Sequence, residues 1–239
     1  MKNSVIGILI LQLVFVQAFA QKNNQLFDLS ASVGNAQGSG SISYVYNWQL
    51  GKNKKFEIGA GARFSSFFSS NKYFITAPAK ITSGSTGPAV LFKENISRNI
   101  DSLLLASSNS NSLNLSINLG YHITKKISAG FNIDAIGFTF GKNQNGNYIN
   151  GNTVVNTTAK PTGFNLLLIS DNDLGSLNSE FYLTYKLNSN WSVKTGYQFL
   201  FSEYTTAAKV QQFPSPNDRF RYKSSSFLIG VRYQLKNNQ

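Results

Sequence analysis

Apolar and polar residues alternate along much of this chain with a period of two. The cleanest run covers residues 113–123, where Leu, Ile and Tyr at odd positions face Asn, Ser, Gly and His at even positions. Alternation of this length predicts a β-strand with one apolar and one polar face. Eight such runs cover residues 27–34, 41–50, 56–65, 113–123, 127–140, 177–187, 191–201 and 227–235.

The number of runs and the character of their polar face predict a closed barrel. The polar positions are mostly Ser, Gly and Asn, which are small enough for a narrow lumen. Each run has roughly the length that a tilted strand needs to cross a bilayer. The sequence therefore predicts an all-β fold, an eight-stranded antiparallel up-and-down transmembrane β-barrel with its apolar face toward lipid. A change of phase near residues 135–136 indicates a β-bulge in the fifth strand.

The predicted connections are mostly short and long in turn. Residues 51–54, 124–126 and 188–190 are short, whereas residues 68–111, 141–176 and 205–221 are long; only residues 34–40 break the pattern. This order places the short turns and both termini at a periplasmic rim, and the long loops at the outer rim. Aromatic residues at the turn-side strand ends are expected to form a periplasmic girdle at the lipid headgroups. They are Phe27, Trp48, Phe56, Tyr121, Trp191 and Tyr233.

The first twenty residues have the pattern of a secretory signal peptide. Lys2 precedes an apolar stretch, and small residues at Ala18 and Ala20 predict cleavage after Ala20. The stretch is too short to span about 30 Å of hydrocarbon comfortably, which argues against the alternative of a membrane anchor. We expect a signal peptide at residues 1–20 and an outer-membrane barrel domain at residues 21–239.

The last run, FLIGVRYQL, resembles the assembly signal in the final strand of outer-membrane barrels. Gly230, Tyr233 and Leu235 match its glycine-x-x-aromatic-x-hydrophobic pattern. Residues 21–239 as a whole resemble the small OmpA/OmpX-like transmembrane barrels, and their Asn- and Lys-rich style is similar to that of barrels from Bacteroidota. The resemblance implies insertion by the barrel-assembly machinery and location in the cell outer membrane. It specifies no activity.

Charged residues at lumen-facing positions balance one another. The acids are Asp28, Glu57, Asp134 and Glu180, and the bases are Arg63, Lys186, Lys194 and Arg232. Closure makes the first and last strands neighbours, so we expect Arg232 to meet Asp28. Because isolated buried charges are costly and pairing offsets that cost, we interpret the network as the filling of a closed barrel. The alternative is a narrow polar pore.

The sequence offers little for catalysis or cofactor binding. It has no Cys and a single His, His122, at the turn end of its strand, which we interpret as a hydrogen-bonded lumen residue. Asp171 and Asp173 could ligate a hard cation such as Ca²⁺, but such residues beside Asn and Ser are also typical of turns. We expect no catalytic, cofactor-binding or metal site, and no enzyme.

The predicted outer loops are the expected contact surface. The net charge of +12 favours an anionic partner, and export argues against nucleic acid. Basic loop residues, including Lys72, Lys93, Arg219 and Arg221, either contact lipopolysaccharide phosphates or form a solvated rim. The apolar run at residues 163–170 is expected to fold over or into the barrel mouth. Residues 95–106 form either a short helix or an extension of the strand.

These features favour a structural or interaction role in the outer membrane. The expected partners are outer-membrane lipid, lipopolysaccharide and envelope or secretion proteins. Three alternatives stay open: an accessory barrel of a secretion system, similar to the PorT type; a narrow channel; and a soluble lipocalin-like carrier, whose apolar face would line the cavity.

Overall fold

The computed structural model describes residues 23–235, in which eight antiparallel strands close into a barrel. They are β1 (Asn23–Gly34), β2 (Gln37–Leu50), β3 (Phe56–Thr76), β4 (Ser102–His122), β5 (Ile127–Phe140), β9 (Leu177–Lys186), β10 (Trp191–Thr206) and β11 (Arg219–Gln234). Each strand pairs with the next around the ring, and β1 pairs with β11 to close it. The predicted all-β, eight-stranded antiparallel up-and-down barrel is confirmed. The predicted signal peptide lies outside the described residues.

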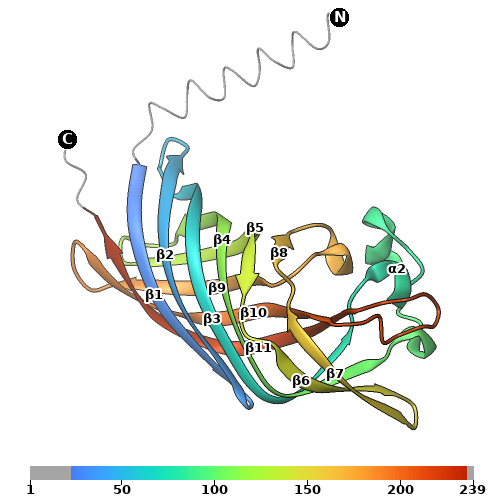
Figure 1. The fold of residues 1–239 in the computed structure, drawn as a ribbon. Coiled ribbons are helices and arrows are strands. Elements are labelled where there is room, and N and C mark those ends of the chain that lie inside the picture. The colour runs from blue at the N-terminus through green and yellow to red at the C-terminus, as the bar shows by residue number, and fades with distance from the viewer. Residues whose placement is uncertain (1–22, 236–239) are drawn as a thin grey trace, which may run out of the picture.

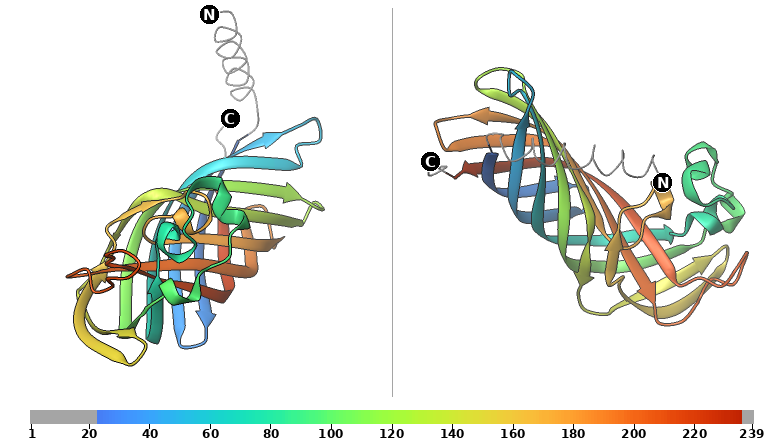
Figure 2. Two further views of the ribbon diagram at one scale, coloured as in Figure 1. Left: turned by 90° about the vertical axis from the view of Figure 1, so that its right-hand side faces the viewer. Right: turned by 90° about the horizontal axis from the view of Figure 1, so that it is seen from above.

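The two ends of this barrel differ (Figure 1 and Figure 2). At one end lie the start of β1, the end of β11 and the short β2–β3, β4–β5 and β9–β10 connections. We call it the turn end. We call the opposite end the crown end. Several strands extend further there, and short helical segments lie beside them, among them α2 (Ala79–Thr82). Within residues 23–235, no helix is both long and apolar enough to cross a bilayer.

At the crown end, four strands of the barrel continue into a second, narrower ring. The β1–β2 hairpin ends before this level, so β3 pairs directly with β11 there. The β5–β9 pair also ends before this level. A hairpin of β6 (Gln144–Asn150) and β7 (Thr153–Pro161) bridges β4 to β10. The resulting order is β3, β4, β6, β7, β10 and β11, which we call the crown ring.

The crown-end connections are shorter than the sequence predicted. β3 extends to Thr76 and β4 begins at Ser102, so residues 95–106 include a strand extension. Helical turns at α2, η1 (Gly87–Phe92) and η2 (Ser97–Asn99) join these two strands. The predicted loop at 141–176 contains β6, β7, β8 (Phe164–Leu166) and η3 (Ser170–Asn172). Much of the predicted loop surface is therefore ordered β-sheet.

On β3 and β4, the positions that point inward switch between odd and even residue numbers where these strands enter the crown ring. On β3, Ser69 and Phe74 are both buried, and between them Asn71 adopts a left-handed φ of 51°. On β4, Ser108 and Leu105 are both buried, although they differ in parity. Beyond this step, apolar side chains replace Ser and Asn on the inside.

The predicted bulge in β5 is confirmed. Leu115 pairs with Ile136 and Ser116 pairs with Asp134, so Ala135 is the extra residue. The Ala135 carbonyl accepts a hydrogen bond from the Leu167 N–H at 2.8 Å, just after β8, which pairs with β5. The bulge thus changes the phase of β5 while Asp134 stays buried in the lumen.

Candidate functional site

The middle of the lumen is occupied by a network of buried ion pairs. The guanidinium of Arg63 contacts the Asp134 carboxylate, with Nη2 and Oδ1 2.5 Å apart, and its Nη1 lies 3.2 Å from Glu180 Oε1. Amides complete the shell: Asn114 donates to Asp134 at 2.7 Å, and Asn132 donates to Glu180 at 2.8 Å. Because Arg63 is 2% exposed, these bonds replace the water that it loses.

The same network continues to the strand pair that closes the barrel. Lys194 Nζ lies 2.6 Å from Glu180 Oε2 and 3.6 Å from Asp28 Oδ2. Arg232 donates to Asp28 through two nitrogens, at 2.6 and 2.7 Å. Arg232 and Asp28 are direct partners in the β1–β11 register. Acids and bases therefore alternate across the lumen, three of each.

Tyr182 packs against two cations of this network. Its ring centroid lies 4.3 Å from Lys194 Nζ and 5.0 Å from the Arg232 guanidinium carbon, and its hydroxyl accepts a hydrogen bond from Arg232 at 2.9 Å. Gly130 faces Tyr182 on β5. A Cβ at Gly130 would lie 2.4 Å from the ring, so this glycine provides the space that the ring occupies.

Six of the eight predicted lumen charges thus lie in one connected network, and the other two lie elsewhere. Glu57 is buried nearer the turn end, while Lys186 is half-buried at the rim and takes part in none of the ion pairs formed within residues 23–235.

At the turn end, His122 links a buried carboxylate to a hydroxyl. Its Nε2 lies 2.9 Å from Glu57 Oε1, and its Nδ1 lies 2.7 Å from Ser128 Oγ. Glu57 also accepts hydrogen bonds from Asn24 at 2.6 Å and from Asn47 at 3.1 Å. These groups border a shallow mouth of about 100 Å³. The arrangement holds the His122 imidazole in one orientation, and it gives the buried Glu57 carboxylate hydrogen bonds in place of those it would make to water.

A second charged cluster lies between the lumen and the crown ring. Glu203 is 0% exposed and accepts from Arg219 Nε at 2.8 Å and from Arg221 Nη2 at 2.8 Å. Both arginines also donate to the backbone carbonyl of Asp173. The expectation that Arg219 and Arg221 belong to a basic outer loop is wrong, because β11 begins at Arg219 and directs both toward Glu203 on β10. Arg221 and Glu203 are register partners, but both are out of phase with the lumen-facing residues of their strands, such as Ser224 and Gln198, so the alternation alone could not have found this pair.

The two acids considered as cation ligands have protein partners. Asp171 Oδ1 lies 2.6 Å from Lys223 Nζ, and Asp173 Oδ1 accepts from the Leu168 N–H at 2.7 Å. Burial raises the pKa of the Asp173 carboxyl above its ordinary value. Among residues 23–235, no three His, Cys, Asp or Glu side chains are grouped to hold a metal ion.

The apolar run at 163–170 does not fill the barrel mouth as expected. Its polar member, Asn165, is fully buried and bonds to Asn114 and Thr139. Phe164, Leu168 and Ile169 are instead exposed. Pairing of β8 with β5 sets this orientation, because alternate residues of a strand point to opposite faces.

The crown ring has an apolar interior. The buried cluster consists of Phe74, Leu103, Leu105, Tyr148, Ala159, Tyr204 and Phe220. Two of its tyrosines make polar contacts: the Tyr148 hydroxyl donates to Asp101 Oδ2 at 2.6 Å, and the Tyr204 hydroxyl donates to the Asn109 carbonyl at 3.1 Å. Burial, together with the hydrogen bond to Asp101, raises the pKa of Tyr148 to about 12.

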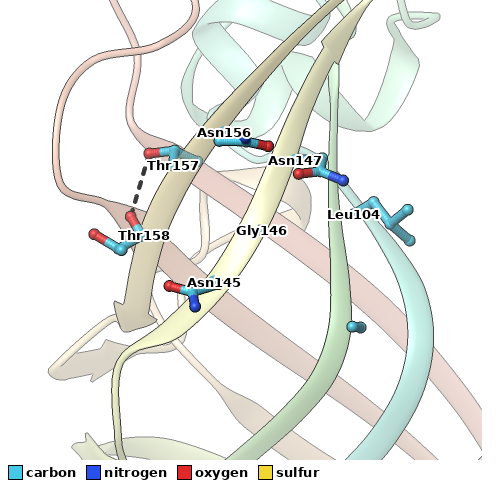
Figure 3. A pocket seen from close by; sticks show the side chains of 8 residues that line it. Leu104, Asn145, Gly146, Asn147, Asn156, Thr157 and Thr158 are labelled. Atoms are coloured by element: carbon cyan, nitrogen blue, oxygen red, sulfur yellow. Dashed lines mark hydrogen bonds between the residues drawn. The ribbon is translucent and has the colours of Figure 1, made fainter.

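The outer face of the crown ring carries a groove of about 700 Å³ over β4, β6 and β7 (Figure 3). Amide and hydroxyl side chains line most of it: Asn145, Asn147, Asn156, Thr157 and Thr158, next to Leu104. In the register, Leu104 faces Asn147, which faces Asn156. The groove therefore presents uncharged hydrogen-bonding groups beside a small apolar surface.

The eight-stranded section presents apolar side chains on its outside. They include Leu29, Ile42, Phe64, Leu113, Leu115, Ile117, Phe138, Phe181, Leu183, Phe199 and Ile229, all exposed. We call this the apolar belt. A carrier with an apolar cavity would have the opposite arrangement.

The predicted girdle residues lie around the turn end. Phe56 stacks on Tyr121 with ring centroids 4.8 Å apart, and Trp191 stacks on Tyr233 at the same distance. Phe27 packs on Tyr44, and Trp48 packs on Tyr46.

The residues of the predicted assembly signal lie on or just after β11. A Cβ at Gly230 would lie 2.6 Å from the Leu29 carbonyl oxygen, so β1 approaches β11 closely there. Tyr233 faces Phe27 across the same pair. Leu235 follows the strand, and its N–H donates to the Gln25 carbonyl at 2.9 Å.

Comparison with known proteins yields similarities in structure only. No family model and no curated protein matches the chain. The chain is similar to the surface protein NspA of Neisseria, at 8% identity and a TM-score of 0.36, over 89% of this chain and 96% of that one. It is similar to the outer membrane protein Ail of Yersinia pestis in a phospholipid nanodisc, at 7% identity and a TM-score of 0.38, over 90% and 100%. It is also similar to a major outer membrane protein of Thermus thermophilus, at 11% identity and a TM-score of 0.38, over 90% and 100%.

Proposed function

We propose that this protein is an integral outer-membrane β-barrel with a structural or interaction role. The observation that carries the proposal is the polarity of the eight-stranded section, whose outside is apolar and whose inside is polar and charged. In water this arrangement would expose a large hydrophobic surface at high cost, whereas in a bilayer it satisfies both faces. The predicted signal peptide supports export, and the short turns at one end support a periplasmic turn end.

The filled lumen favours a closed barrel over the alternative of a narrow pore. The network from Asp134 to Arg232 crosses the middle of the barrel with both charged and amide groups bonded. A cavity beside it, lined by Ser65, Asp134 and Asn178 among others, holds only about 10 Å³, roughly the minimum for one water. Ion flow would require several buried ion pairs to separate, which is costly.

The crown end is the proposed contact surface. Its sheet is rigidly supported by an apolar core, and it displays exposed apolar side chains, with Phe92 at 87% and Leu91 at 61% exposure. Exposed apolar groups at a loop tip are typical of protein contacts. Lys80, Lys93 and Arg98 are also exposed there and are suited to lipopolysaccharide phosphates.

Single-cysteine labelling tests the membrane placement, because the natural chain has no Cys. Ala89→Cys lies in an exposed crown-end turn and Asn53→Cys in an exposed turn-end loop. In intact cells an impermeant maleimide should label only Ala89→Cys, and after outer-membrane disruption it should label both. Recovery of the protein in the soluble periplasmic fraction would contradict the proposal. Planar-bilayer recording of the refolded protein should show no steady conductance, and a stable open current would favour the pore.

A further inference from the structure

Lysines in or beside the three short connections make the turn end strongly basic. Lys52, Lys54 and Lys55 lie between β2 and β3, Lys125 and Lys126 lie between β4 and β5, and Lys186 ends β9. All are exposed except Lys186, which is half-buried. Together they equal half of the formal net charge of +12. We call these six the turn lysines.

The turn lysines have no carboxylate partner within the described chain. None of them takes part in an ion pair among residues 23–235. The acids nearest to them in sequence are Glu57, Asp134 and Glu180. The Glu57 carboxylate is buried and already bonded to His122 and three amides, and Asp134 and Glu180 are paired with bases of the lumen network. The crown end differs, because its charges include Glu203 and Asp171, whose carboxylates contact bases. The turn end therefore carries a positive charge that nothing in the fold neutralises.

Each lysine turn is flanked by side chains that face the same surroundings as the apolar belt. Phe56 follows the first turn and is 61% exposed, Ile123 and Ile127 flank the second, and Leu187 follows Lys186. Girdle residues Trp191 and Tyr121 lie at the same level. The turn lysines thus lie where the apolar belt ends, at the depth at which a long lysine side chain reaches the headgroup region.

We propose that the turn lysines bind the phosphates of anionic phospholipids in the leaflet that surrounds the turn end. This inference rests on the proposed function, because it requires the barrel to lie in a bilayer. Phospholipid is favoured over a soluble acidic partner by the distribution of the charge. Lysines lie in two of the three turns and at the strand end that begins the third, and every turn adjoins exposed apolar side chains, which matches a surrounding ring of lipid.

The two tryptophans of the chain provide the readout. Trp48 and Trp191 both lie near the turn end, on β2 and β10, so their fluorescence reports on the lipids beside the turn lysines. We would refold the mature chain into phosphatidylcholine vesicles. Brominated phosphatidylglycerol or brominated phosphatidylcholine would then be added as the quencher at equal mole fraction.

Quenching should favour phosphatidylglycerol, by on the order of fivefold in relative affinity for one lysine–phosphate contact. High salt should reduce this preference. The variant K125Q/K126Q/K186Q, which removes half of the turn lysines, should show a clearly smaller preference, whereas the matched crown-end variant K93Q/K142Q/K160Q should keep it in full, since those three lysines are exposed at the other end.

Two results would overturn the proposal while leaving the proposed function intact. One is insertion with equal quenching by the two lipids, which would point instead to a soluble acidic partner. The other is a preference that is undiminished in K125Q/K126Q/K186Q. Insertion is scored separately by the blue shift of tryptophan emission. A chain that fails to insert would overturn the proposed function, and this proposal with it.

Discussion

The eight-stranded section and the crown ring share four strands but have opposite interiors. In the eight-stranded section β4 turns Ser110, Ser112 and Asn114 inward and Leu113 outward. Ten residues earlier, in the crown ring, the same strand turns Leu103 and Leu105 inward. β3 makes the same change between Ser69 and Phe74. One strand thus serves two surroundings by changing the phase of its alternation once.

Two physical causes explain the difference. In the proposed membrane placement, the eight-stranded section lies beside lipid, where an apolar outside is favourable and the hydrophobic effect does not drive apolar groups inward, so the interior is left to polar pairs. The crown ring would then lie outside the bilayer, where water surrounds the strands and apolar groups are buried as in any soluble protein. The number of strands adds to this, because a six-stranded ring is narrower and a few aromatic rings fill it. The comparison teaches that the surroundings decide which face of a strand is buried.

The largest effect should come from breaking the lumen network. Arg63→Met leaves Asp134 and Glu180 buried with one cation fewer. Removal of one partner of a buried pair typically costs about 3–5 kcal/mol. Urea unfolding in vesicles, followed by tryptophan emission, would measure this loss. The control Arg98→Met, at an exposed crown-end residue, should change stability by less than about 0.5 kcal/mol. Equal stability of both variants would show that the network does not hold the barrel together.

Two leucines of β4 test the crown ring against the eight-stranded section. Leu103 is fully buried and Leu113 is 54% exposed. Leu103→Ala should leave a cavity in the crown ring and cost about 2–5 kcal/mol. Leu113→Ala should cost less, about 1–2 kcal/mol, because lipid fills the space. Protease sensitivity of the crown end and global unfolding would be measured for both. A larger cost for Leu113→Ala would contradict the assignment of the two interiors.

The eight-stranded section was predictable from sequence because its apolar outside and polar lumen impose strict alternation on each strand. Closure alone then predicted that Asp28 faces Arg232, which lie in contact in the structure. The crown ring was not predictable in this way. Residues 69–71 and 106–112 are small, mostly polar residues on both faces, so no alternation marks the change of phase at Asn71. The ring also depends on pairing of β6–β7 with β4 and β10, which are far apart in sequence. Arg219 and Arg221 were misplaced for the same reason.

A charged residue introduced on the apolar belt tests whether the outside of the eight-stranded section faces lipid while that of the crown ring faces water. Leu113→Arg places a guanidinium at a position that we assign to lipid, and this should cost about 2–4 kcal/mol near the bilayer midplane. Ala106→Arg lies on the same strand but at an exposed crown-ring position, so its cost should be close to zero. Folding yield in vesicles and urea unfolding would be compared. Equal tolerance of both substitutions would place Leu113 in water and contradict the membrane assignment.

The smallest effect concerns the contact between Tyr148 and Asp101 in the crown-ring interior. Tyr148→Phe removes the hydroxyl that donates to Asp101 at 2.6 Å and should cost about 1–3 kcal/mol at neutral pH, as for other bonds to charged groups. The pKa of Tyr148 is raised to about 12, chiefly by burial, above the ordinary value of about 10. The fold therefore favours the protonated hydroxyl. Its contribution is complete below pH 10 and is lost as the pH rises toward 12.

Alkaline titration provides the measurement for this contact. In the natural chain the crown end should become protease-sensitive between about pH 10 and 12, before the eight-stranded section unfolds, because the Tyr148 phenolate would face the Asp101 carboxylate in a buried site. In Tyr148→Phe, crown-end sensitivity should depend less on pH over this range, although the crown ring starts from lower stability. An unchanged alkaline profile in the variant would mean that another group sets the pH limit. The eight-stranded section, whose lumen lacks this contact, serves as the internal control in the same sample.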